Sequence, residues 1–90
     1  MMAYHVVVFG KVQGVNFRRF IQQEAAGRGI TGWVRNNPNG SVEFTAEGEK
    51  EIVQQLVSQA RVGPSGAAVE HLEIQHWPIK QREFTGFEVV

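Results

Sequence analysis

The apolar positions change their spacing several times along the chain, and each spacing predicts a different element. Residues 4–9 are an almost unbroken apolar run rich in β-branched and aromatic side chains, which predicts a strand buried on one or both faces. From Phe17 onward the spacing becomes helical. An apolar stripe predicts an amphipathic helix of about three turns, with Gly27 and Gly29 as candidate stops, and it comprises Phe17, Phe20, Ile21 and Ala25.

A hairpin is predicted next, over residues 31–47. Residues 31–36 form a short strand candidate, and the turn cluster 37–40 ends in Asn39-Gly40, a strong hairpin signal. Apolar and polar residues then alternate from Val42 to Glu47, which predicts a half-buried strand. We expect the glutamates of residues 43–51 to form a solvated strand face and the start of the next helix.

The second half of the chain repeats the helix and strand patterns. Residues 49–60 carry one apolar face and predict a second helix, followed by a loop at 63–66. Residues 69–77 predict a further strand that Pro78 closes, and residues 84–90 predict a last short strand. The order strand–helix–strand–strand–helix–strand indicates an α+β ferredoxin-like βαββαβ sandwich, an antiparallel sheet with both helices on one face.

Length and charge narrow the class of protein. Ninety residues predict one domain over residues 1–90, and nine basic residues balance nine acidic ones, which argues against a nucleic-acid partner. The chain has no cysteine, which excludes disulfides and thiolate chemistry. We see no apolar run long enough to span a membrane and no signal-peptide pattern, so we expect a cytoplasmic protein without a membrane partner, and a monomer.

The stretch Gly10–Arg18 carries the candidate chemistry. A short glycine-containing turn between a strand and a helix points backbone N–H groups at one spot, where the helix dipole also favours negative charge. Arg18 adds a planar fork of donors suited to phosphate or carboxylate oxygens. No Lys-Ser/Thr follows Gly14, and the glycine spacing is not G-x-G-x-x-G, so nucleotide-binding loops are excluded. The residues predict an anion-binding loop.

Two motifs in correct order and spacing resemble the acylphosphatase family. The first is Gly10-x-Val12-Gln13-Gly14-Val15-x-Phe17-Arg18, and the second is Gly32-Trp33-Val34-x-Asn36. The resemblance extends through Glu47-Gly48 and, more loosely, to Phe87. It departs at Asn16, where many relatives carry glycine; asparagine is the side chain that best tolerates positive φ after glycine. Asn16 could narrow the pocket and change substrate preference.

The resemblance implies hydrolysis of small acyl phosphates to carboxylate and inorganic phosphate, without a metal or other cofactor. It assigns phosphate binding to loop amides and the Arg18 side chain, and it assigns the orientation of the attacking water to Asn36. The phosphate-binding residues it implies are Gln13, Gly14, Val15, Asn16, Phe17 and Arg18. For Gln13 we expect the amide, rather than the side chain, to matter.

Each candidate also has a structural interpretation. Arg18 could be a solvated helix arginine and Asn36 a turn residue, but the full motif favours the functional roles. We expect Arg19 to be a surface charge, because it lies about 100° around the helix from Arg18. Trp33 and Phe20 are expected to pack. The histidines have no metal-ligand spacing, so we expect no metal site.

Two alternatives from other classes remain open. One is a non-catalytic module that binds anions or carbamoyl phosphate, like the acylphosphatase-type domain within larger hydrogenase-maturation proteins. The other is an RNA-binding ferredoxin-like domain, which would need basic and aromatic residues on its central strands where this chain has Glu43, Thr45 and Glu47.

Overall fold

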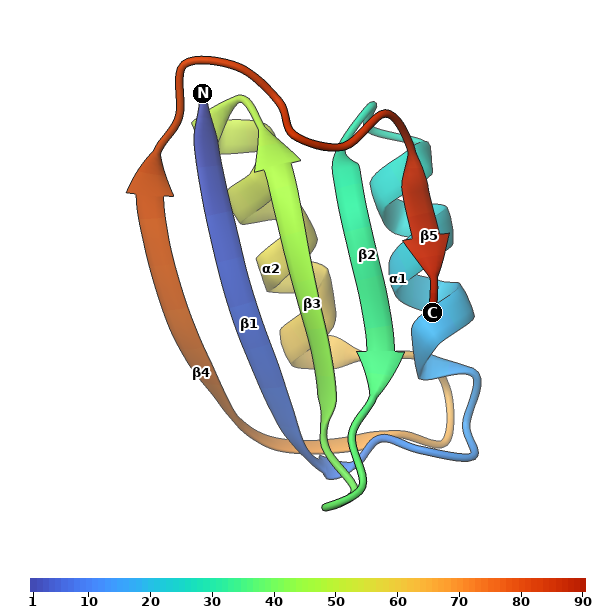
Figure 1. Ribbon diagram of the computed structural model, residues 1–90. Coiled ribbons are helices and arrows are strands. Elements are labelled where there is room, and N and C mark those ends of the chain that lie inside the picture. The colour runs from blue at the N-terminus through green and yellow to red at the C-terminus, as the bar shows by residue number, and fades with distance from the viewer.

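Five strands and two helices make up the computed structural model, which describes residues 1–90 (Figure 1). In chain order they are β1 (Met2–Lys11), α1 (Phe17–Ala26), β2 (Thr31–Asn36), β3 (Val42–Gly48), α2 (Lys50–Val62), β4 (Ala68–Pro78) and β5 (Phe87–Val89). Neither helix is long and apolar enough to cross a membrane.

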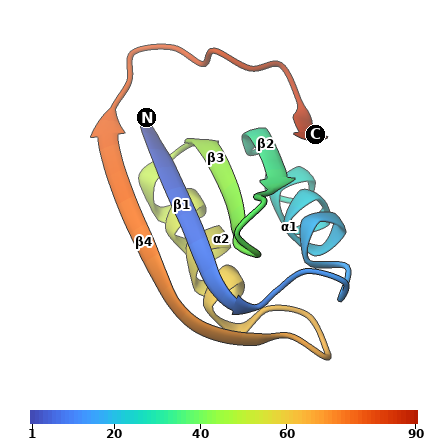
Figure 2. The same ribbon diagram turned by 60° about the horizontal axis from the view of Figure 1, so that its bottom comes forward.

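The sheet has the strand order β4-β1-β3-β2-β5, and both helices cover the same face of it (Figures 1 and 2). The four longer strands pair antiparallel, as expected for a ferredoxin-like α+β fold. The structure differs from the expectation at β5, which pairs parallel to β2 and makes the sheet mixed. The cause is the connection 79–86, which crosses the end of the sheet and enters the far edge in the direction of β2 (Figure 1).

The core lies between the sheet and the two helices. Val6 and Val8 of β1 and Phe44 of β3 are fully buried and meet Leu56 of α2. Phe17, the first residue of α1, is also in this core. Burying a side chain of this size contributes roughly 1.5–3 kcal/mol, so the start of α1 is held firmly against the sheet. The loop before it is thereby fixed in space.

A bulge at Gly10 turns the chain out of the sheet toward that loop. The β1–β4 register shifts between Phe9 and Gly10, and Gly10 has φ +129°. A Cβ atom built there would lie 2.1 Å from the carbonyl oxygen of Ala68. No side chain fits such a gap, so glycine is required by both backbone conformation and space.

A buried carboxylate fastens the connection 79–86 to the sheet. Glu47 is only 2% exposed, which corrects the expectation that the glutamates of 43–51 are solvated. Its Oε2 accepts a hydrogen bond from the Glu83 amide at 2.9 Å, and its Oε1 accepts from Thr31 Oγ1 at 3.0 Å and from the Phe84 amide at 3.2 Å. These hydrogen bonds compensate for the burial of the carboxylate. The alternation of apolar and polar residues along the strand does not reveal them.

Candidate active site

The segment between β1 and α1 presents a row of uncommitted backbone donors. Gly14 has φ +76°, and Asn16 has φ +63° and ψ +28°, the left-handed conformation that its asparagine side chain tolerates. No backbone N–H of residues 14–19 donates to another group of the protein. Since unpaired N–H groups at a helix start attract anions, this geometry is suited to binding an anion.

Two arginines occupy the first turn of α1, a position that is unfavourable for cations. The helix dipole places partial positive charge there, and the first turn has no acidic residue. Neither Arg18 nor Arg19 takes part in an ion pair, because the basic partners of the three ion pairs are His5, Arg28 and Arg35. The site therefore concentrates positive charge without a carboxylate to neutralise it.

Asn36 reaches the same site from a different element. It is the last residue of β2, pairs with Val42 of β3, and is partly buried. Its side-chain amide makes no hydrogen bond within the protein. The amide is therefore free to bind a water molecule or a substrate oxygen.

A cavity of about 370 Å³ brings these groups together. It is lined by five of the residues that the sequence singled out, namely Gly14, Asn16, Phe17, Arg18 and Asn36. Four further residues line it, which the sequence analysis did not assign to the site: Val12, Arg19, Gln22 and Val89. Helical spacing could have suggested Gln22, which lies one turn after Arg18, whereas Val89 is placed there by tertiary folding alone.

Gln13 and Val15 of the predicted phosphate-binding set do not line this cavity. The Gln13 side chain instead connects the loop to the β2–β3 turn, where its Nε2 donates to the carbonyl oxygens of Asn37 at 2.8 Å and Ser41 at 2.9 Å. The side chain thus has a definite structural role, contrary to the expectation that only its amide matters. Val15 packs against the hydrophobic core.

The opposite face of the sheet holds a different charged cluster. Glu43 accepts hydrogen bonds from Arg35, and His5 Nε2 lies 2.5 Å from Glu43 Oε2. Burial raises the pKa of the Glu43 carboxyl, but the hydrogen bonds and charges of His5 and Arg35 outweigh burial, so this pKa lies below its ordinary value. Arg35 also lies 5.3 Å from the centre of the Trp33 ring, which agrees with a packing role for Trp33.

A second depression, of about 460 Å³, lies beside Trp33, Arg35 and Phe84. It contains none of the free loop amides, and its arginine is already paired with Glu43. None of the three histidines belongs to a cluster of acidic or histidine side chains that could hold a metal ion. Of these two depressions, only the cavity at the start of α1 combines unpaired loop amides with an unpaired arginine.

Fold and cavity together define a class: small ferredoxin-like α+β proteins with a strand-to-helix loop suited to an anion. The comparisons identify the family within that class. The sequence model of the acylphosphatase family matches residues 4–89, and the chain belongs to this family.

Individual relatives agree with this assignment over nearly full length. The acylphosphatase of Pelotomaculum thermopropionicum is 44% identical over 94% of this chain and 91% of its own. The acylphosphatase of Pyrobaculum aerophilum is 42% identical over 100% and 95%. The crystal structure of the Bacillus subtilis acylphosphatase superposes with a TM-score of 0.94 at 34% identity, covering 100% of this chain and 99% of that one. As a member of this family, the chain is an acyl phosphate hydrolase.

Proposed function

We propose that the loop amides and the Arg18 side chain hold the phosphate group of a small acyl phosphate, while Asn36 orients the water that attacks it. The observation that carries the proposal is a shared cavity. The cavity is lined by the loop and helix-start residues 14 and 16–19, whose N–H groups have no partner, by the unpaired Arg18 side chain and by the uncommitted Asn36. Donors fixed in advance around a phosphate stabilise the charge that develops on its oxygens during transfer.

The proposed reaction needs little covalent help from the protein. Water adds to phosphorus, the bond between phosphorus and the acyl oxygen breaks, and that oxygen leaves as a carboxylate. A carboxylate is a good leaving group, so no strong general acid is required. We propose that a phosphate oxygen of the substrate accepts the proton of the attacking water, giving inorganic phosphate as the second product. Catalysis then rests on positioning and charge stabilisation.

Arg18 supplies in this proposal the positive charge for which many phosphoryl-transfer enzymes use a metal ion. Arg18 is partly buried, lines the cavity and has no competing carboxylate. An arginine remains protonated at any physiological pH and binds two phosphate oxygens at once. We therefore propose that hydrolysis proceeds without a metal or other cofactor.

The domain organisation, oligomeric state, location and partners of the protein are also proposals. We infer that residues 1–90 act as one domain, as a monomer in the cytoplasm, and that the chain binds no nucleic acid. The balance of nine basic and nine acidic residues supports the last point. Light scattering after size-exclusion chromatography measures the molar mass in solution and so tests the monomeric state. A mass twice that of the chain would contradict it.

Hydrolysis of benzoyl phosphate in excess chelator tests the assignment of roles. We expect the wild type to turn over under these conditions. Arg18→Gln should lose phosphate binding and about 10³-fold or more in kcat/KM. Asn36→Ala should lose about 10²- to 10³-fold in kcat while still binding inorganic phosphate, because only the water has lost its partner. Titration calorimetry with phosphate separates the two effects.

Arg61→Gln is the matched control, because Arg61 is an exposed arginine on α2 that makes no ion pair. It removes the same charge and should leave both kcat and KM unchanged. An Asn36→Ala enzyme with a near wild-type rate would refute the water-orienting role. Turnover that appears only after Mg²⁺ is added would refute the metal-free mechanism.

A further inference from the structure

The catalytic cavity extends beyond the groups assigned to the phosphate. Besides the groups assigned to the phosphate and the water, its lining includes Arg19, Gln22 and Val89. Gln22 Nε2 donates to the carbonyl oxygen of Phe87 at 3.2 Å, which ties this wall of α1 to β5. Since the loop takes up the phosphate end of the substrate, this part of the cavity faces the acyl group.

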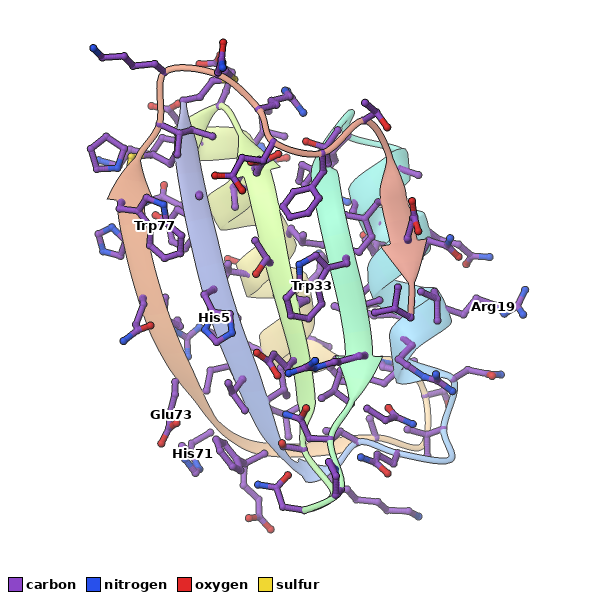
Figure 3. All side chains as sticks on the ribbon, viewed as in Figure 1. His5, Arg19, Trp33, His71, Glu73 and Trp77 are labelled. Atoms are coloured by element: carbon purple, nitrogen blue, oxygen red, sulfur yellow. The ribbon has the colours of Figure 1, made fainter.

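Arg19 is the charged residue of that outer part. It is exposed, makes no ion pair and no side-chain hydrogen bond, and extends from α1 into solvent beside β5 (Figure 3). No acidic residue lines the cavity. The nearest glutamates in sequence on these two elements are engaged or turned away, because Glu24 pairs with Arg28 and Glu88 lines the depression beside Trp33.

The position of Arg19 costs the helix stability and gains no partner within the protein. A cation in the first turn opposes the helix dipole, and Arg19 lines the same cavity as the positive Arg18. A second negative charge on the ligand, next to the phosphate, would relieve this repulsion.

We propose that Arg19 determines substrate preference by favouring acyl phosphates whose acyl group carries its own negative charge, such as a second carboxylate. The inference rests on the proposed function, because the loop and Arg18 must hold the phosphate end for the acyl end to reach Arg19. An exposed pair of this kind changes kcat/KM by about two- to fivefold, mainly through KM, and the effect weakens as salt screens it.

Two rigid substrates test the proposal, benzoyl phosphate and 4-carboxybenzoyl phosphate, which differ by one carboxylate. The measured quantity is the ratio of their kcat/KM values, so that the intrinsic difference in reactivity cancels between enzyme variants. Arg19→Gln should lower the preference for the carboxylated substrate about two- to fivefold, and Arg19→Glu should lower it further. Raising NaCl from 20 to about 500 mM should remove most of the wild-type preference.

Lys80→Gln is the control for net charge, because Lys80 is exposed in the connection at the opposite end of the sheet from the catalytic loop. It should leave the ratio unchanged. If Arg19→Gln hydrolyses both substrates with the wild-type ratio, the proposal is wrong while the catalytic assignment stands. If the wild type hydrolyses neither substrate, the catalytic assignment itself fails.

Discussion

Asn16 contributes to the loop through its backbone conformation. It is the one non-glycine residue of the chain with positive φ, and its carbonyl oxygen accepts the first helical hydrogen bond, from the Phe20 amide at 3.0 Å. Asn16 and Gly14, which also has positive φ, both line the cavity. From the sequence, asparagine was expected to tolerate this conformation best after glycine, should the loop require it.

Substitution of Asn16 by valine should therefore damage both stability and activity. A β-branched side chain in left-handed geometry costs roughly 1–2 kcal/mol, so thermal unfolding should shift down and phosphate affinity should fall as the amides lose alignment. Asn16→Gly is the matched control, because glycine adopts the same backbone without strain. Calorimetry on both variants checks the prediction; equal losses in the two would point to the asparagine side chain instead.

At the scale of elements, the proposed catalytic site is an assembly of two separate pieces. In this proposal the loop before α1 supplies the phosphate donors, and the β2–β3 hairpin supplies Asn36. The Gln13 side chain joins them through its two bonds to the hairpin carbonyls. Asn37 Nδ2 donates to Ser41 Oγ at 3.0 Å, so the turn that receives Gln13 is itself braced.

Gln13→Glu should reduce kcat about 10- to 100-fold with a smaller change in phosphate affinity. The added carboxylate oxygen would face two carbonyl oxygens in place of a donor, pushing the hairpin and its Asn36 away from the loop. Gln81→Glu, at an exposed position remote from the cavity, introduces the same charge as a control. A loss of melting temperature with kcat unchanged would show that Gln13 stabilises the fold without positioning Asn36.

The sequence was a good guide to local elements and to motif residues, and a poor one to contacts between them. The periodicity of Phe17, Ile21 and Ala25 predicted α1, and all three are buried. The parallel pairing of β5 depends on the path of residues 79–86, which no local pattern encodes. The hydrogen bonds of the Gln13 side chain were missed for the same reason, because its partners lie in a distant hairpin. Arg19 is exposed, as expected for a surface charge, but its place in the cavity lining was not predicted.

At the scale of the whole molecule, the Glu43 cluster links stability to pH. Its folded-state pKa lies below the ordinary value of 4.5, so the ionised carboxylate stabilises the fold. That contribution is fully present above about pH 4.5, where the unfolded chain is also ionised, and it is lost as pH falls through the lowered pKa.

Glu43→Gln should therefore lower the free energy of unfolding at pH 7 by about 1 kcal/mol and by less as the pH drops below 4. Urea titrations of wild type and variant at several pH values measure the difference. Glu70→Gln, an exposed glutamate without an ion pair, should show no such convergence. A constant gap between wild type and Glu43→Gln across the whole pH range would contradict the linkage.

The register of the sheet also determines at which stage of folding the enzyme can become active. Met2 pairs with both Gly48 and Pro78, so β1 finds both of its partner strands only after most of the chain has been brought back to it. Chains dominated by such distant pairings fold slowly, since loop closure must precede the contacts that reward it. The phosphate loop leaves the end of that same strand, so a newly made chain gains catalytic competence late, together with its global topology.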